Sequence, residues 1–386
     1  MLRKGHHFTQ ALAAAMILAL GMGFGRFAFT GMYPLMLKES VLTISSGSLV
    51  ASSNYAGYLI GALLLTKVQP KNSRLFSISS IFLTTLCFYL LVFIHTAYGI
   101  IFIRFMAGLF SAASMISASV WLLHHINLSQ NAPLLYSGVG VGIILSAEII
   151  AFGQYLDYSS SIIWLILASV SLIAGILTSL YLVEIKNSVD TNKSIKNKIK
   201  NIIRGEINSP IKIILIYGIA GFGYIITATY LPLLMKEITK GINPIHIWAI
   251  FGLGAIPSCF LWYKIFNFLG ARFSLGFNLL LQALGVILPV ISQTSLSYIT
   301  SALLVGGTFM GTVTIAMSSA RTIAHKINFN IFAALTSAYG IGQVLGPLCA
   351  SFLYTIHHSF ALSLTMAATA LTIGFLIILI PEKQRK

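Results

Sequence analysis

The chain has 386 residues, of which 57% are hydrophobic and only 8% are charged, and its formal net charge is +16. Soluble domains carry roughly 25% charged residues, so this composition excludes a soluble globular protein and indicates an integral helical membrane protein. The basic excess does not indicate nucleic-acid binding, because basic residues of membrane proteins collect in their cytoplasmic loops.

Apolar runs recur along nearly the whole chain, and each is long enough to cross a hydrocarbon core of roughly 30 Å as a helix. One long polar stretch separates the sixth run from the seventh. The predicted domains are therefore an N-terminal six-helix bundle (1–183), a cytoplasmic linker (184–210) and a C-terminal six-helix bundle (211–386). The twelve predicted spans are 8–37, 47–68, 74–95, 97–123, 133–155, 160–183, 211–235, 243–265, 271–292, 297–322, 330–355 and 358–380.

The distribution of basic residues predicts the orientation of these spans. If both termini and the loops that follow even-numbered spans share one side, that side holds most of the 24 Lys and Arg residues. By the positive-inside rule, this side is the cytoplasm. We therefore expect a multi-pass protein of the lipid bilayer with both termini in the cytoplasm.

The two halves of the chain contain similar segments. "GFGRFAFTGMYPLMLKE" begins at Gly23 and "GFGYIITATYLPLLMKE" begins at Gly221, with seven of 17 positions identical at an offset of 221 − 23 = 198 residues. Six spans separate the two segments, so the halves repeat in the same orientation. The predicted fold class is an all-α integral membrane protein with twelve transmembrane helices in two parallel-repeated six-helix bundles. Such a fold places a cavity between the bundles, near the bilayer midplane.

Three segments carry a resemblance to a known family: "GFGRFAFTGMYPLM" (23–36), "SNYAGYLIGALL" (53–64) and "RFMAGLFSAA" (104–113). With them the chain resembles the major facilitator superfamily, and within it the YbfB/YjiJ-like branch of bacterial permeases. The resemblance implies a transporter of the bacterial cytoplasmic (inner) membrane that acts as a single chain, as a monomer, on a small-molecule substrate.

The segment "RFMAG" also resembles the superfamily's fourth-span motif, an Arg with a Gly four residues on, and this resemblance associates Arg104 with proton coupling. Two departures from the superfamily's pattern are visible. The loop between spans two and three keeps Gly61 and its basic residues but lacks the usual acidic residue, and span five lacks the Gly-Pro pair that is typical of antiporters.

Four polar residues of the N-terminal half are predicted to share one layer of the membrane. At 1.5 Å per residue, Arg26 lies about 16 Å below the periplasmic end of span one, and Arg104 about 9 Å down span four. Glu148 and Asn54 lie about 10 Å down spans five and two.

A lone charge in hydrocarbon costs at least about 2.5–3.5 kcal/mol, so we expect Glu148, water or an anionic ligand to neutralise Arg26. Two arginines against one glutamate leave a nominal charge of +1, which favours an anionic substrate. Protonation of Glu148 would then change the availability of the arginines and couple transport to protons. The alternative is a fixed ion-pair cluster in which Arg26, Arg104 and Glu148 brace spans one, four and five.

The C-terminal half has no charged residue at comparable depth. The position equivalent to Arg26 is Tyr224, since 26 + 198 = 224. With Thr227, Tyr230 and Gln343 it is expected to offer neutral hydrogen bonds and aromatic surface to the substrate. Ordinary helix packing is the alternative interpretation of the tyrosines.

Other features are interpreted as structural. Asn54, Gly57 and Tyr58 lie on one helical face of span two, where small residues allow a neighbouring helix to approach closely. Pro34 and Pro232 are predicted to bend spans one and seven.

Together these features predict a secondary active transporter of a small organic solute, anionic or zwitterionic, that is coupled to protons and works by alternating access. One alternative is a drug or metabolite exporter of the same fold, and another is a non-transporting membrane sensor or scaffold. The sequence contains no nucleotide-binding motif, no catalytic constellation and no metal-ligand spacing. We therefore expect no enzyme activity, no cofactor, no metal site and no nucleic-acid partner.

Overall fold

A computed structural model describes residues 2–182, 207, 209–235, 243–324 and 327–381, and within this part of the chain the long elements are all helices. The α-helices α1 to α7 form the first half of the fold, with short π and 3-10 segments between some of them, and α8 to α12 form the second half. The elements are α1 (Leu2–Leu18), η1 (Ala19–Phe24), α2 (Ala28–Lys38), α3 (Ile44–Leu64), η2 (Leu65–Lys67), α4 (Pro70–Phe93), α5 (Ala97–Val120), η3 (Trp121–His125), η4 (Ser129–Asn131), α6 (Ala132–Tyr155), α7 (Ser160–Tyr181), α8 (Pro210–Met235), α9 (Pro244–Ile291), α10 (Ser295–Ile323), α11 (Ile331–His357) and α12 (Ala361–Leu379).

Eleven helical stretches among the described residues are long and apolar enough to cross a membrane. One of them, α9, has 48 residues and would be about 72 Å long as a straight helix, more than twice the hydrocarbon thickness. Its backbone leaves the helical conformation at Gly270, with φ 79° and ψ 174°, a combination that only glycine adopts readily. The chain turns there, so α9 contains the predicted spans eight and nine, and the prediction of twelve spans is confirmed.

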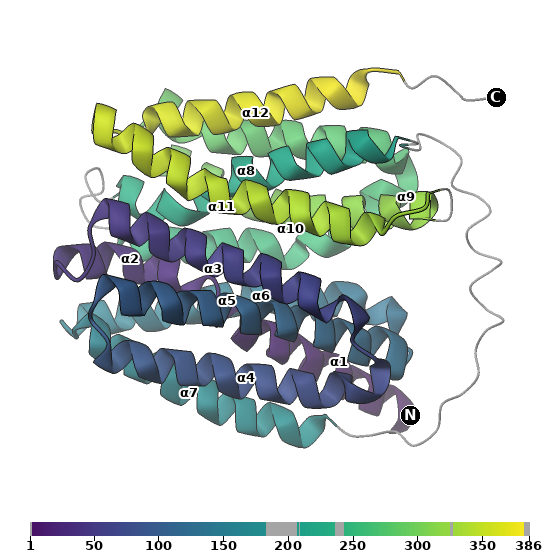
Figure 1. Ribbon diagram of the computed structural model, residues 1–386, viewed down its shortest axis with the longest axis horizontal. Helices are drawn as coiled ribbons and strands as arrows, with labels where there is room; N and C mark the ends of the chain where they lie inside the picture. The colour runs from purple at the N-terminus through teal and green to yellow at the C-terminus, as the bar shows by residue number, and fades with distance from the viewer. Residues whose placement is uncertain (1, 183–206, 208, 236–242, 325–326, 382–386) are drawn as a thin grey trace.

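The helices form two six-helix bundles packed side by side (Figure 1). The first bundle, α1 to α7, fills the lower part of the view, and the second, α8 to α12, fills the upper part. The bundles meet where α6 packs on α9 and where α3 packs on α11. The bounds predicted for the two domains stay a prediction, and most of the predicted linker lies outside the described residues.

Glycines allow the closest approaches within and between the bundles. Gly142 in α6 packs on the backbone of Ala19 in span one, and Gly342 in α11 packs on the backbone of Gly218 in span seven. Both contacts join the fifth span of a bundle to the first span of the same bundle, so the two halves pack in a similar way. Between the bundles, a Cβ atom on Gly140 would lie only 2.7 Å from the carbonyl oxygen of Gly252, so this seam requires glycine.

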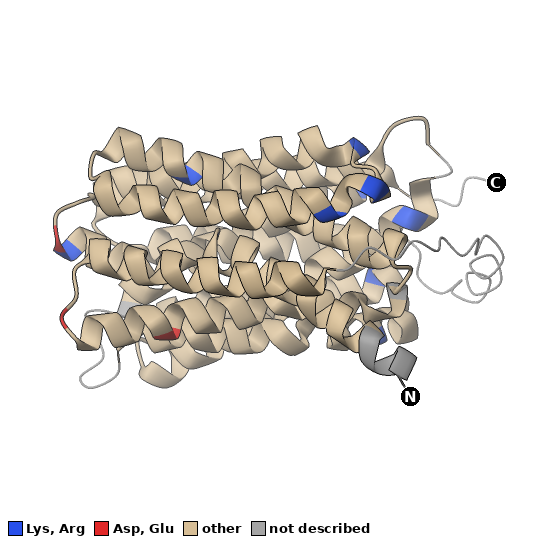
Figure 2. Cartoon of the chain, turned by 90° about the horizontal axis from the view of Figure 1, so that it is seen from below, with Lys and Arg blue, Asp and Glu red and all other residues tan. Residues whose placement is uncertain are grey.

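The helices start and finish at two opposite ends of the molecule, and α1 begins at the end where α12 finishes (Figure 1). We name this end the terminal end and the opposite one, where α2 turns into α3, the far end. Most of the described Lys and Arg residues gather at the terminal end, and the described Asp and Glu residues lie toward the far end (Figure 2). The predicted topology places most basic residues of the loops on one side of the membrane, and the uneven distribution of charge between the two ends agrees with it.

Candidate functional site

The first transmembrane span is broken near the middle of its length, between Phe24 and Ala28. The helix that starts as α1 widens into the π-helical η1, ends at Phe24, and resumes as α2 at Ala28. Pro34, which is predicted to bend span one, does not make this break, because it lies inside α2. Pro232, its counterpart in span seven, lies inside α8, which continues through it as a helix. A break in a helix leaves backbone carbonyls without intrahelical partners, and inside a membrane these carbonyls need other donors.

Side chains from neighbouring spans donate to carbonyls at the break, although the Phe27 carbonyl oxygen also accepts from Thr30 N at 3.2 Å within span one. Ser111 Oγ donates to the Gly21 carbonyl oxygen at 2.5 Å, and Trp248 Nε1 donates to the Phe27 carbonyl oxygen at 3.2 Å. Trp248 belongs to the second bundle, so the break in span one is also a point of contact between the bundles.

Arg104 satisfies the two carbonyls between these positions. Its Nη1 donates to the Gly25 carbonyl oxygen and its Nη2 to the Arg26 carbonyl oxygen, both at 2.8 Å. The side chain is 1% exposed. Asn54 Nδ2 in turn donates to the carbonyl oxygen of Arg104 at 2.8 Å. The structure therefore brings the predicted residues Arg104 and Asn54 together: the Arg104 side chain bonds the backbone of span one, and the Asn54 side chain bonds the backbone of Arg104.

Arg26 stands on the broken segment, and its guanidinium is enclosed by aromatic rings. The guanidinium carbon lies 4.4 Å from the ring centre of Tyr58, 4.9 Å from that of Tyr55 and 5.2 Å from that of Phe27. The residue is only 4% exposed, yet its Nε and Nη2 atoms have no hydrogen-bond partner. Cation–π contacts cover the guanidinium, but they leave these two N–H donors unsatisfied.

The second bundle places polar aromatic side chains in the neighbourhood of Arg26. Tyr224 and Tyr339 lie within electrostatic range of Arg26. The hydroxyl of Tyr224 accepts a hydrogen bond from Gln343 Nε2 at 2.5 Å, while Gln343 Oε1 is buried without a partner. We name Arg26, Tyr55, Tyr58, Tyr224, Tyr339 and Gln343 the Arg26 cluster.

Three of these residues follow from the sequence: Arg26, its repeat equivalent Tyr224, and Gln343. The predictions missed Tyr55 and Tyr339 and took Tyr58 for a packing residue. Tyr55 and Tyr58 are three positions apart on α3, so their side chains project on adjacent sides of the helix. Tyr339 lies four residues before Gln343 on α11, on the same face. This helical spacing is the signal that would have found them.

Glu148 does not belong to the cluster, and the expectation that it pairs with Arg26 is corrected. Its Oε1 atom lies 3.0 Å from Nδ1 of His246, and the two side chains are 48% and 47% exposed. Arg26 is buried, so the two charged side chains lie in different environments. The predicted bracing of spans one, four and five by three charged side chains is therefore not present in this conformation.

Tyr230 lies on the face of the second bundle that packs on the first. Its hydroxyl lies 2.6 Å from Ser48 Oγ in the first bundle and donates to the Pro347 carbonyl oxygen of α11 at 3.0 Å. Its hydroxyl proton is used within the protein, so in this conformation Tyr230 holds helices together.

Hydrogen bonds between the bundles run from the membrane midplane to the far end. They hold the far end shut in this conformation. The pairs are Phe27 with Trp248, Thr30 with Ala228, Ser48 with Tyr230, Ser52 with Val344, Tyr55 with Thr229, Glu148 with His246 and Gln154 with Asn243, at 2.6–3.5 Å. Thr30 and Ala228 are equivalent positions of the internal repeat, so their contact lies close to the pseudo-twofold axis between the bundles.

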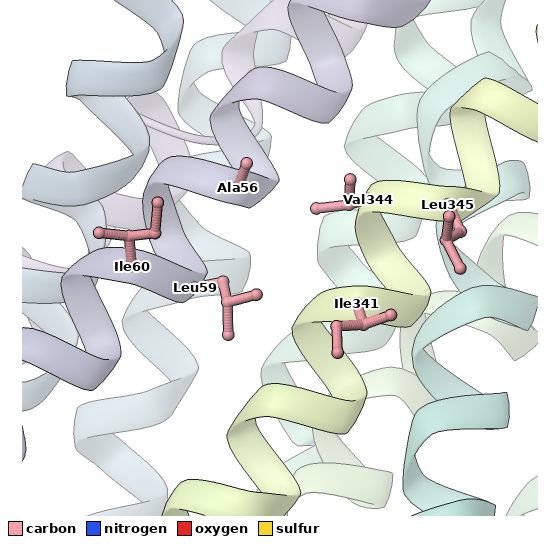
Figure 3. Close-up of a pocket in the computed structure, with 6 residues that line it drawn as sticks. All are labelled: Ala56, Leu59, Ile60, Ile341, Val344 and Leu345. Atoms are coloured by element: carbon pink, nitrogen blue, oxygen red, sulfur yellow. The ribbon is translucent and has the colours of Figure 1, made fainter.

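A separate groove of about 210 Å³ lies at the seam between α3 and α11 (Figure 3). It is lined by Ala56, Leu59, Ile60, Ile341, Val344 and Leu345. Ile341, for example, is half exposed. Because the lining carries no polar side chain, the groove cannot compensate the charge of a charged solute, and we do not assign the solute site to it. Among the described residues no group of three His, Cys, Asp or Glu side chains has the arrangement of a metal site.

Residues 18–379 match the sequence profile of the family described as "Uncharacterised MFS-type transporter YbfB". Among solved structures, the crystal structure of nucleoside transporter NupG is similar to this chain, with a TM-score of 0.70 at 12% sequence identity. The likeness covers 98% of this chain and 100% of that one, and at this identity it shows the fold alone. No functionally curated protein matches the chain in sequence.

Proposed function

Because the chain belongs to the YbfB family of major facilitator transporters, we propose that it moves a small organic anion across the membrane by alternating access between its two bundles. One observation carries the proposal. Arg26 is a buried cation at the interface of the bundles, and two of its nitrogen atoms, Nε and Nη2, have no hydrogen-bond partner. An anionic substrate would satisfy both the charge and the donors, which a purely structural arginine would already have satisfied within the protein.

The contacts between the bundles support alternating access. The Arg26 cluster draws its residues from α3 and the span-one break in the first bundle, and from α8 and α11 in the second. A substrate that binds there touches both bundles, so it interacts differently with states in which the bundles are closed or separated at the far end. Only such a difference in binding free energy allows a ligand to shift a conformational equilibrium.

The finer parts of the proposal concern orientation and state. We place the terminal end, with both termini and the 184–210 linker, in the cytoplasm of a bacterial cell, because the basic residues gather there. The far end then faces the periplasm and is shut in this conformation. The protein acts as a monomer, since the proposed site is complete within one chain. Uptake is proposed, and export of a drug or metabolite is the alternative direction.

The first prediction tests the role of Arg26. In proteoliposomes supplied with a mixture of small organic acids, Arg26→Ala is expected to abolish protein-dependent accumulation, because the only uncommitted cation of the site is lost. The measurement is the acid content of the vesicles by mass spectrometry. Arg321→Ala, which removes an exposed arginine near the terminal end, is the matched control and is expected to transport as the wild type does.

Accumulation of the same acids at the wild-type rate by a folded Arg26→Ala protein would contradict the proposal. Absence of flux in the wild type for every solute tested, neutral ones included, would favour the sensor or scaffold alternative.

We also propose that protons drive the transport, through the Glu148–His246 pair. The two side chains, a carboxyl group and an imidazole, come from opposite bundles, lie 3.0 Å apart and are both about half exposed. Opening of the far end must separate them, so protonation of either group would alter the balance between closed and open states. From the sequence alone, protonation of Glu148 is expected to act on the arginines of its own bundle. In the present proposal it acts instead on the contact between Glu148 and His246 of the second bundle.

The second prediction tests this pair. Glu148→Gln is expected to lose accumulation driven by a pH gradient while it retains substrate counterflow, which needs no net driving force. The measurement compares the two modes in the same vesicles, and His246→Gln serves as the variant of the other partner. If Glu148→Gln accumulates substrate against its gradient as the wild type does, the pair does not couple protons to transport.

A further inference from the structure

We infer that the solute held at Arg26 is a flat aromatic monocarboxylate. This inference rests on the proposed function and makes its substrate class specific. It selects the anionic over the zwitterionic class, and an aromatic over an aliphatic body.

The first step concerns the geometry of the free donors. The Nε–H of an arginine and one N–H of Nη2 lie parallel on the same edge of the guanidinium, and a carboxylate accepts both with its two oxygens. These two nitrogen atoms are the ones of Arg26 that have no partner. The ring centres of Tyr58, Tyr55 and Phe27 lie 4.4–5.2 Å from the guanidinium carbon. Aromatic rings offer no conventional hydrogen-bond acceptor, so the Nε–Nη2 edge is the part of Arg26 that can bind the carboxylate of a ligand.

The second step concerns the number of charges. Arg26 is the arginine that offers an unpaired two-donor edge, because Nη1 and Nη2 of Arg104 already donate to backbone carbonyls of span one. A second carboxylate, or the second charge of a phosphate, would therefore lack a full partner. The cluster as described contains no acidic side chain, and Glu148 pairs with His246. The ammonium of an amino acid would be buried without a counter-charge, which is costly.

The third step concerns the body of the solute. Aromatic rings continue from the cluster through the second bundle. Tyr339 stacks on Tyr217 and on Tyr224, with ring centres 4.3 Å and 5.8 Å apart. Tyr224 in turn stacks on Phe309, with ring centres 5.5 Å apart. A planar ring joins such a stack with a favourable geometry that a puckered aliphatic ring does not have. In an aromatic carboxylate the acid group is conjugated with the ring, so one flat molecule can meet both the arginine edge and the stacked rings.

The experiment measures binding to the purified, full-length protein by calorimetry, with five probes. They are benzoate, its neutral analogue benzamide, the aliphatic cyclohexanecarboxylate, the dianion terephthalate and the zwitterion phenylalanine. Benzoate is expected to bind most tightly. Cyclohexanecarboxylate is expected to bind about threefold to tenfold more weakly than benzoate, because it lacks the binding free energy of one aromatic stacking contact. The other three probes are expected to show no binding at concentrations that saturate the protein with benzoate.

Variants separate this inference from the function on which it rests. Arg26→Lys keeps the charge but loses the two-donor edge, and is expected to weaken benzoate binding about 10- to 100-fold. Arg321→Lys is the matched control and is expected to bind benzoate as the wild type does. Failure of benzoate to bind, or Arg26-dependent binding that is tighter for phenylalanine, terephthalate or cyclohexanecarboxylate, overturns the aromatic monocarboxylate and leaves an Arg26-based transporter in place. Binding of the anions that is indifferent to Arg26→Lys and to Arg26→Ala overturns both.

Discussion

Replacement of Arg104 by alanine is expected to lower the stability of the folded protein by about 2–5 kcal/mol, a larger loss than any change in the Arg26 cluster causes. The guanidinium donates two hydrogen bonds to the carbonyls of Gly25 and Arg26 at the break in span one. Without it, both carbonyls are buried in the membrane with no donor, and the truncated side chain leaves a cavity. The measurement is the thermal unfolding midpoint of the purified protein in detergent, followed by size-exclusion chromatography.

Two further variants keep this prediction testable if Arg104→Ala does not fold. Arg104→Lys keeps one positive charge beside the carbonyl end of the first half-helix, where a cation is favourable, but lacks the planar fork that serves two carbonyls. It is expected to melt between the wild type and the alanine variant. Asn54→Ala, which removes the donor to the carbonyl of Arg104, is expected to lower the midpoint by less. Unchanged melting of Arg104→Ala would show that the break does not depend on this side chain.

This stability prediction also separates the two intramembrane arginines, which the sequence presents alike. Both are single basic residues in apolar spans, and depth alone places them in one layer. Only the structure shows that Arg104 donates two hydrogen bonds to backbone carbonyls, while two nitrogens of Arg26 donate to nothing. A folded but inactive Arg26 variant beside a poorly folded Arg104 variant is the pattern that this difference predicts.

The spans and the repeat follow from the sequence because they depend on local composition. Outside α9, the ends of the predicted spans agree with those of the membrane-spanning helices to within four residues. The repeat offset of 198 places Tyr224 opposite Arg26, and the structure places both in one cluster across the bundle interface. Hydropathy and pairwise similarity are sufficient for these features because no contact between distant residues is needed to recognise them.

The error over Glu148 has a specific geometric cause. The rise per residue gives depth, but the direction of a side chain around its helix must come from packing. Gly142 faces span one, where it packs on the backbone of Ala19. Glu148 follows six residues later, and six steps of about 100° turn it about 120° away from that face. The glycines of α6 would have indicated this direction from the sequence, had they been used to identify the face that packs on span one.

The break in span one could not be read from its own residues. The segment contains glycines but no proline before Pro34, and Arg104, Ser111 and Trp248 donate hydrogen bonds to carbonyls at the break. Two of these side chains belong to α5 and one to the second bundle. The local backbone therefore depends on long-range partners, and single-sequence patterns do not report such partners.

Cross-linking the two bundles at the far end is expected to stop transport completely. Gln154 Oε1 and Asn243 Nδ2 lie 3.5 Å apart, on α6 of the first bundle and immediately before α9 of the second. Cysteines at these two positions, joined by a short bis-methanethiosulfonate that forms a reducible disulfide with each thiol and releases sulfinate, would hold the far end in the closed arrangement. Alternating access requires this end to open once in each cycle, so substrate counterflow should fall to the level of protein-free vesicles and return when the cross-link is reduced.

The native thiols make the experiment practical. Cys87 and Cys259 are buried and Cys349 is partly buried, so serine at these three positions gives a background in which only the new pair reacts. The two single-cysteine variants, treated with the same reagent, are the matched controls and should transport as their untreated forms do. Full counterflow by the cross-linked protein would mean that the far end need not open, and alternating access between these two bundles would have to be abandoned.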